Sequence, residues 1–155
     1  MADLTHLDDE GRARMIDVGG KPVTDRSATA EAVVVMAAET RAALFSGGLP
    51  KGDAIGVARL AAIGGAKKTS ELVPLCHPLL VDGIDVDIEE VDTGVRLEVT
   101  VRTSGRTGVE MEAMTGAAVG AVALYDMIKG VDRAAEIAAV RLLAKSGGRS
   151  GEWRR

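Results

Sequence analysis

The stretch that decides the fold is IDVDIEEVDTGVRLEVTVR, residues 84–102. Apolar residues occupy every second position over 84–88 and again over 95–101, with charged or polar residues between them. This alternation is typical of strands with one buried face and one face toward water. Asp92-Thr93-Gly94 joins the two runs as a short connection. We therefore predict two neighbouring antiparallel strands.

The segments before this hairpin predict one strand followed by two helices. Residues 28–36 are apolar and β-branched toward their end, which favours a strand. Residues 37–45 have helical composition and stop at a glycine pair. A second helix is expected to begin after Asp53, a candidate N-cap, and to run to about Ala66. Residues 69–78 contain two prolines and are predicted to be a loop.

The longest predicted helix covers residues 110–129, closed by Gly130 as a residue beyond its C-cap. Thr107 and Glu110 match a capping box at its start. Gly116 and Gly120 stand four apart on one face, so either a sheet or a second copy of the helix should approach closely. An apolar stripe is expected from Met111, Met114, Ala118, Ala121, Tyr125 and Ile128.

A final strand at residues 137–144 completes the order strand, two helices, hairpin, helix, strand. The expected fold class is α+β, with helices on one face of an antiparallel sheet of about four strands in a ferredoxin-like arrangement. The whole chain, residues 1–155, is predicted to be a single domain. Residues 1–12 are expected to form a flexible arm, and residues 145–155 a mobile basic tail. Residues 13–18 are compatible with a short strand or an extended arm.

Composition narrows the classes of function. The chain has 155 residues and a formal net charge of −4, which argues against nucleic acid or an anionic membrane as the partner. Aromatic residues make up 2%, so recognition by base stacking is disfavoured. The single cysteine, Cys76, cannot form an internal disulfide, which fits a cytoplasmic protein. No apolar run approaches the roughly 20 residues that span a bilayer.

Several side chains could carry chemistry, although each also has a simpler interpretation. Asp126 and Lys129 stand three apart near a helix end, where a surface ion pair is the favoured local interpretation. Cys76 and His77 lie between two prolines, and their adjacent placement is poor metal-ligand spacing. A metal-dependent hydrolase using Cys76, His77 and Glu112 is therefore only weakly supported. No Walker-type phosphate loop or Rossmann fingerprint is present.

Taken together, the motifs resemble one family, the molybdenum cofactor biosynthesis protein C family of cyclic pyranopterin monophosphate synthases. The resemblance extends over nearly the whole chain. The blocks that carry it are Leu4–Asp8, Ala13–Val18, Lys51-Gly52-Asp53, Leu75-Cys76-His77-Pro78, Arg106–Ala113, Tyr125–Lys129 and Lys145–Gly148.

The resemblance implies conversion of 3′,8-cyclo-7,8-dihydroguanosine 5′-triphosphate to cyclic pyranopterin monophosphate with release of pyrophosphate, a lyase reaction. It implies a ferredoxin-like homohexamer, a trimer of dimers with its sites at the dimer interface. Asp126 would be the catalytic acid or base, with Lys129 and Lys51 as essential lysines. The substrate would be bound by Leu75, Cys76, His77, Glu110, Met111, Glu112 and Lys145.

This activity makes physical sense of the cations. A triphosphate needs positive charge placed near the leaving pyrophosphate, and ring rearrangement needs positioned acids and bases. No obligatory cofactor or protein metal site is expected, although magnesium could accompany the substrate phosphates. The alternative from another class is a non-catalytic ferredoxin-like module that binds a nucleotide at a subunit interface. It would explain the lysines but not the separate acidic clusters.

Overall fold

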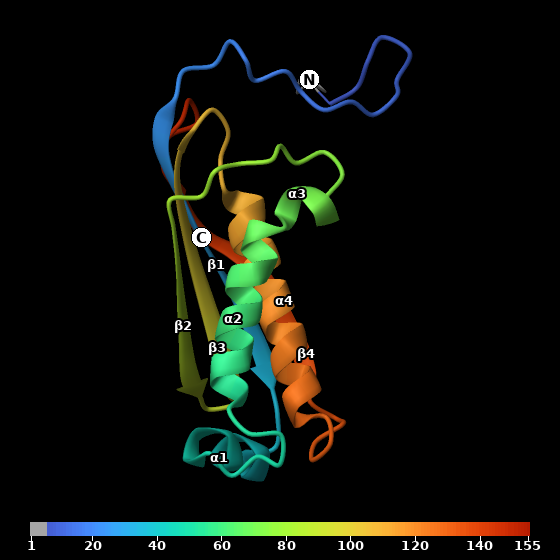
Figure 1. Cartoon of the computed structure of the whole chain (residues 1–155), viewed down its shortest axis with the longest axis vertical. Helices are drawn as coiled ribbons and strands as arrows, with labels where there is room; N and C mark the ends of the chain where they lie inside the picture. Colours follow the sequence, from blue (N-terminus) through green and yellow to red (C-terminus); the bar gives the residue numbers. More distant parts are fainter. Residues whose placement is uncertain (1–5) are drawn as a thin grey trace.

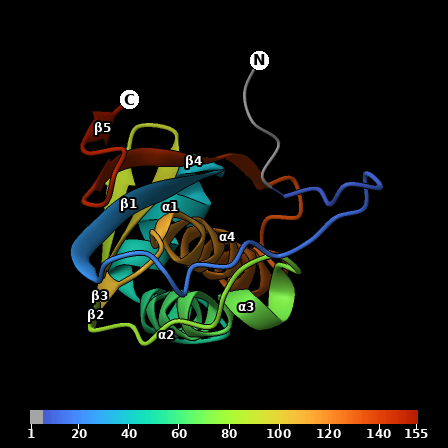
Figure 2. The same cartoon turned by 90° about the horizontal axis from the view of Figure 1, so that it is seen from above.

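A computed structural model describes residues 6–155 and has the α+β architecture of Figures 1 and 2. One antiparallel sheet has the strand order β2-β3-β1-β4-β5, and its first four strands have the ferredoxin-like order. The elements in chain order are β1 (Thr24–Val35), α1 (Ala38–Ser46), α2 (Ala54–Lys67), α3 (Thr69–Leu72), β2 (Gly83–Val91), β3 (Gly94–Gly105), α4 (Glu110–Ile128), β4 (Glu136–Ser146) and β5 (Trp153–Arg154).

The hairpin predicted from residues 84–102 is confirmed as β2 and β3. The two strands pair antiparallel, with Ile84 opposite Val101 and Val91 opposite Gly94. The apolar positions of β3 face the helices and are fully buried, whereas the intervening polar residues lie on the opposite face. The single buried face of this hairpin fixes which side of the sheet α2 and α4 cover, as Figure 2 shows.

The helix-free face of the sheet is held by an ionic network around Glu31 at the centre of β1. Arg96 donates to Glu31 over 2.7 Å and Arg141 donates to it over 2.6 Å. Burial alone would raise the pKa of Glu31, but the two guanidinium groups outweigh it and lower that pKa. The three residues come from β3, β1 and β4, so the network ties three neighbouring strands together.

The glycine face of α4 is approached closely, as predicted. A Cβ atom on Gly116 would lie 3.0 Å from the Ala62 carbonyl oxygen of α2, and 3.1 Å from a Val99 methyl group of β3. A Cβ atom on Gly120 would lie 3.0 Å from Ala62 Cβ and 3.1 Å from Leu97 Cδ2. The close neighbours are thus both the sheet and α2 of the same chain, which is why glycine is required here.

The predicted details of α4 are partly wrong. Its N-cap is Val109, without a side-chain cap, and Glu110 is already the first helical residue, so Thr107 forms no capping box. Gly130 does not have the left-handed φ expected of a closing glycine. The stripe is also wrong at Met111, which is 41% exposed. The buried face of α4 is rotated relative to the predicted stripe because α4 packs against both α2 and the sheet. The buried residues are Glu112, Ala113, Gly116, Ala117, Gly120, Ala121, Leu124 and Ile128.

Other differences concern the connections and the tail. The predicted loop at 69–78 contains the short helix α3, in which the buried Thr69 hydroxyl donates to the Ala66 carbonyl. Ser146 still belongs to β4, and residues 153–154 pair with that strand as β5, so the tail expected to be mobile is attached to the sheet at both ends. Residues 13–18 form no strand, and Ala13 makes only an isolated antiparallel bridge with Leu7. The part of the predicted arm at residues 1–5 lies outside the described residues.

One helix among the described residues, α4, is long and apolar enough to cross a membrane by length and composition. The sequence predicted no such stretch, because glycines and other small residues lower the apparent hydrophobicity of this segment. In the fold, α4 lies beside α2 and packs against both α2 and the sheet (Figure 1). Its apolarity is therefore accounted for by the core of the domain.

The close packing of α4 generates a stability prediction. Gly120→Val should lower the free energy of unfolding by about 1–3 kcal/mol or more, because the added side chain overlaps Ala62 and Leu97. The matched control is Gly64→Ala in α2, where an added Cβ meets nothing within 4 Å. That change should raise stability by up to about 1 kcal/mol. Urea denaturation of both variants measures the difference, and equal stabilities would contradict this account of α4.

Candidate functional site

The residues that the sequence singled out fall into two groups at opposite ends of α4. Glu110 and Glu112 lie in its first turn, whereas Asp126 lies in its last turn and Lys129 is its C-cap. A helix of 19 residues is roughly 28 Å long at 1.5 Å per residue. One chain therefore does not bring all the predicted site residues together.

The first group, the lysine–aspartate cluster, consists of Lys51, Asp126 and Lys129. Lys129 Nζ lies 2.7 Å from Asp126 Oδ1, and Lys51 Nζ lies 3.0 Å from Asp126 Oδ2. Lys51 also donates to the Asp126 backbone carbonyl over 2.6 Å. The three side chains are all half-exposed, so they are open to a ligand from outside the chain.

These contacts set the protonation states of the lysine–aspartate cluster. The pKa of Asp126 is lowered mainly by a hydrogen bond from Lys129 and, to a smaller extent, by one from Lys51. The same hydrogen bond to Asp126 raises the pKa of Lys129. At neutral pH the cluster thus holds a carboxylate between ammonium groups, so a ligand would meet one proton acceptor beside a proton donor. The surface ion pair between Asp126 and Lys129 that the local sequence favours is present. Lys51, which is distant in the chain, adds a second cation to it.

The loop before α2 delivers Lys51 to the end of α4. Gly47 and Gly52 both have left-handed φ angles, of 75° and 88°, which only glycine adopts readily. Leu49 is buried and fastens this loop to the core. The predicted N-cap is confirmed, since the Asp53 carboxylate accepts from the Gly56 N–H over 2.8 Å and begins α2.

The second group lines a smaller pocket of about 270 Å³ at the other end of α4. The loop between α3 and β2 supplies Leu75, Cys76 and His77, and the start of α4 supplies its acidic turn. Six residues predicted as substrate-binding meet here. The complete lining is His6, Ile16, Val18, Lys21, Leu75, Cys76, His77, Leu79, Thr107, Gly108, Glu110, Met111 and Glu112.

Burial perturbs two acidic groups in the smaller pocket. Glu112 is 4% exposed, and this burial raises the pKa of its carboxyl above the usual range. Burial also raises the pKa of the Cys76 thiol, and the charge of Glu112 adds to the effect. Glu112 can therefore be protonated at a higher pH than an exposed glutamate, as a proton donor near neutrality requires.

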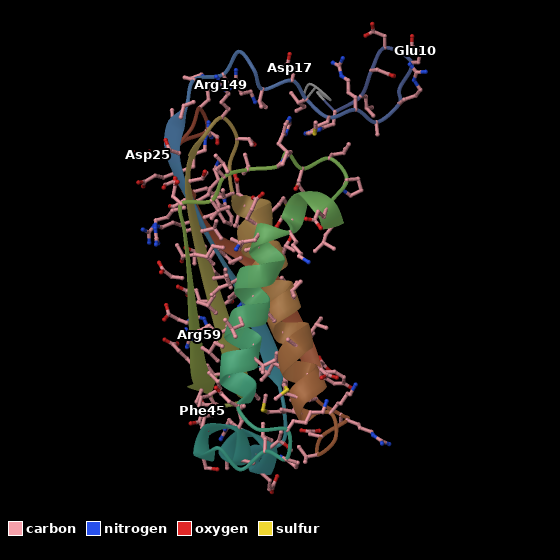
Figure 3. The ribbon with its side chains drawn as sticks, viewed as in Figure 1. Glu10, Asp17, Asp25, Phe45, Arg59 and Arg149 are labelled. Atoms are coloured by element: carbon pink, nitrogen blue, oxygen red, sulfur yellow. The ribbon has the colours of Figure 1, made fainter. Side chains whose placement is uncertain are left out.

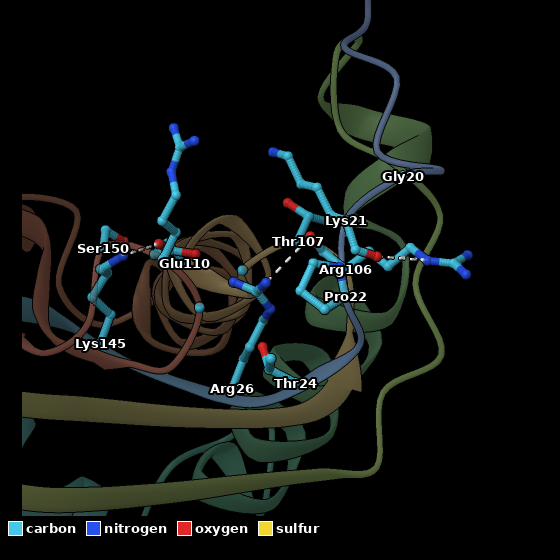
Figure 4. A pocket seen from close by; sticks show the side chains of 13 residues that line it. Gly20, Lys21, Pro22, Thr24, Arg26, Arg106, Thr107, Glu110, Lys145 and Ser150 are labelled. Atoms are coloured by element: carbon cyan, nitrogen blue, oxygen red, sulfur yellow. Dashed lines mark hydrogen bonds and ion pairs between the residues drawn. The ribbon is translucent and has the colours of Figure 1, made fainter.

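A larger basic pocket of about 680 Å³ adjoins the smaller one and shares Lys21, Thr107, Gly108 and Glu110 with it. Lys145, the predicted pocket lysine at the end of β4, lies here with its Nζ 3.4 Å from Glu110 Oε1 and also contacts Ser150 (Figure 4). The cations lining this pocket are Lys21, Arg26, Arg106, Lys145 and Arg149.

Four of these five cations, all except Lys145, were not among the site residues predicted from the sequence. Arg26 is held in place by donating to the Gly105 carbonyl over 3.0 Å, and Figure 4 shows it between Lys21 and Lys145. Arg149 follows two glycines with left-handed φ, at Gly147 and Gly148, and reaches the same end of the molecule (Figure 3). This cluster is assembled from three separate chain segments, at residues 21–26, 106 and 145–149, and its signals in the sequence were the glycine-rich basic tail and the motif block that begins at Arg106.

The proposed alternative of a metal-dependent hydrolase finds no geometric support. Cys76, His77 and Glu112 do line one pocket, but residues 6–155 contain no group of three potential ligands placed to hold a metal ion. Their positions fit proton transfer or hydrogen bonding to a ligand better.

The raised pKa of Cys76 predicts a specific pattern of alkylation. At a given pH less thiolate is present than for an exposed cysteine, so the rate of reaction with iodoacetamide should rise only at higher pH. Glu112→Gln removes a negative charge and should shift this pH profile downward. Glu71→Gln, an exposed change in α3, is the control and should leave the profile in place. A profile unaffected by Glu112→Gln would contradict the contribution of the Glu112 charge.

Comparison with known proteins is consistent with this geometry. The family model described as the MoaC family matches residues 15–148. A protein of Corynebacterium glutamicum (strain R) named cyclic pyranopterin monophosphate synthase is 53% identical over 99% of this chain and 98% of its own length. A protein of the same name from Pelotomaculum thermopropionicum is 54% identical, covering 100% and 92%. Its counterpart from Streptomyces coelicolor is 51% identical, covering 98% and 89%. This chain belongs to the MoaC family.

Proposed function

We propose that this protein is an enzyme of molybdenum cofactor biosynthesis that converts 3′,8-cyclo-7,8-dihydroguanosine 5′-triphosphate to cyclic pyranopterin monophosphate and pyrophosphate. Relatives that are 51–54% identical over nearly the whole chain carry the name of the corresponding synthase. The observation that carries the proposal is the pair of adjoining pockets, one strongly basic and one lined by Cys76, His77 and a buried Glu112.

In this proposal the triphosphate lies in the basic pocket. Arg26, Lys145 and Arg149 offer guanidinium and ammonium donors from two distant parts of the chain, which suits a polyanion better than a single lysine would. Charge develops on the leaving pyrophosphate as the cyclic phosphate closes, and cations already in place stabilise it. Magnesium would enter only with the substrate phosphates.

The guanine-derived ring would lie in the smaller pocket. His77 and Glu112 there can accept and donate protons, while Leu75, Cys76 and Met111 contribute the less polar wall. Burial raises the pKa of the Glu112 carboxyl, and in its protonated form that carboxyl can donate a hydrogen bond or a proton to a ring nitrogen or oxygen. The reaction class is that of a phosphorus–oxygen lyase acting in the cytoplasm.

The lysine–aspartate cluster would reach the same substrate from a second copy of the chain. Roughly 28 Å of helix separates it from the smaller pocket within one chain, which is longer than a nucleoside triphosphate. If one active site combines the smaller pocket of one copy with the lysine–aspartate cluster of a second copy, both groups can reach the same substrate. We propose that these paired sites occur in a homohexamer built as a trimer of dimers.

The defining experiment supplies the cyclic dihydro-GTP substrate and follows both products. A pterin product with one pyrophosphate per turnover is expected. Binding detected by calorimetry without any chemical change in the ligand would instead favour a regulatory nucleotide-binding module.

Variants of the lysine–aspartate cluster test its catalytic role. Asp126→Asn and Lys129→Ala should each lower turnover by about 100-fold or more, because they remove the proton acceptor or its neighbouring donor. Both side chains are exposed, so the thermal midpoint and oligomeric state should stay as in the parent protein. Arg133→Ala, an exposed cation just beyond the helix, is the control. Near-normal turnover in either cluster variant would refute the assignment.

Mixed oligomers test whether two copies build one site. Lys129→Ala and His77→Ala are each expected to be inactive, but co-expressed with different tags they should give mixed dimers. Each mixed dimer would contain one site with both defects and one intact site, so an equal mixture should recover about one quarter of the parent activity. Purified mixed dimers that stay inactive would contradict a shared site.

A further inference from the structure

The N-terminal arm, residues 6–21, lies across the smaller pocket and forms part of its wall. Ile16 and Val18 are half-buried and line the pocket, whereas Met15 and Asp17 beside them are exposed. Within residues 6–155, which the structure describes, residues 14–21 of the arm have no strand partner, so apolar contacts alone would hold them weakly. Figure 3 shows the arm, with Asp17 and Glu10 labelled, running over the end of the molecule that carries the pockets.

Among the described residues, two hydrogen bonds fasten this arm to the rest of the domain. His77 Nε2 lies 2.7 Å from the Ile16 carbonyl oxygen, and Arg106 Nε donates to the Lys21 carbonyl over 3.1 Å. Both partners on the domain side line the pockets, His77 the smaller and Arg106 the basic one. The arm is thus attached through the same side chains that face the pockets.

The contact with Ile16 determines where His77 carries its proton. A backbone carbonyl oxygen can only accept a hydrogen bond, so the ring nitrogen facing it must be the donor. In the neutral ring the proton is therefore on Nε2, and Nδ1 has a free lone pair. The group that sets this arrangement belongs to the main chain of the arm and not to a side chain.

We infer that the arm is a positioning element, in which the Ile16 carbonyl fixes the orientation and tautomer of His77 so that Nδ1 is presented as a proton acceptor. Ile16 and Val18 keep that carbonyl in place by packing into the pocket wall. Resting on the proposed function, this assigns His77 the task of accepting a hydrogen bond or a proton from an N–H or O–H group of the ring substrate. Glu112, whose pKa is raised by burial, would then be the complementary donor in the same pocket.

The test uses the full-length protein without substrate, labelled with ¹⁵N-histidine. The chain has only two histidines, so a His6→Ala sample assigns the His77 ring signals. At a pH where the ring spectra show it to be neutral, we expect an Nε2–H proton that is protected from exchange with water. The double variant Ile16→Asn with Val18→Asn should lose this protection while retaining its helix content by circular dichroism. Met15→Asn, an exposed neighbour on the same arm, is the matched control and should keep it.

Activity provides the second readout. The double variant should lose up to about 100-fold in kcat/KM, since misplacing a reacting group by about 1 Å costs that much, and Met15→Asn should not. A proton on Nδ1 in the parent protein, or protection that persists in the double variant, would overturn the inference. So would lost protection with unchanged kcat/KM. If the parent protein shows the protected Nε2–H but never turns over the cyclic dihydro-GTP, the proposed function is wrong. The inference that the Ile16 carbonyl orients the His77 ring would still be supported.

Discussion

The close approach of α4 to α2 and to β3 is the constraint on which the rest of the molecule depends. Gly116 and Gly120 remove the side chains that would otherwise separate these three elements. Because α4 is fixed against both neighbours, its rotation is set along its whole length. That rotation turns Glu112 into the interior at one end and leaves Asp126 exposed at the other.

The two ends of α4 consequently give two carboxylates opposite electrostatic environments. Glu112 loses water on burial, which raises its pKa, whereas Asp126 stays solvated between two ammonium groups, which lowers its pKa. The same functional group is therefore prepared as a proton donor in one place and as a base or anchor in the other. Neither state follows from the residue type, since both depend on what α4 packs against.

Much of the fold was predictable because its signals are local. The alternation over residues 84–102 led directly to β2 and β3, and Asp53 correctly marked the start of α2. The predictions failed where tertiary packing overrides local preference. Thr107 has the right spacing for a capping box, but the turn before α4 uses Thr107 to line both pockets. Met111 fits a helical stripe, but α4 faces two neighbours and leaves it exposed.

By itself the sequence determined the class of fold, the order and type of its main elements and the residue types available for chemistry, because hydrophobic period and motif blocks are local properties. Only the tertiary structure decided which of those residues meet. It placed the Lys51 and His77 loops at opposite ends of α4, gathered Arg26, Lys145 and Arg149 into one basic pocket, and laid the Ile16 carbonyl against His77. Such contacts join segments far apart in the chain, and their geometry depends on the packing of the whole core.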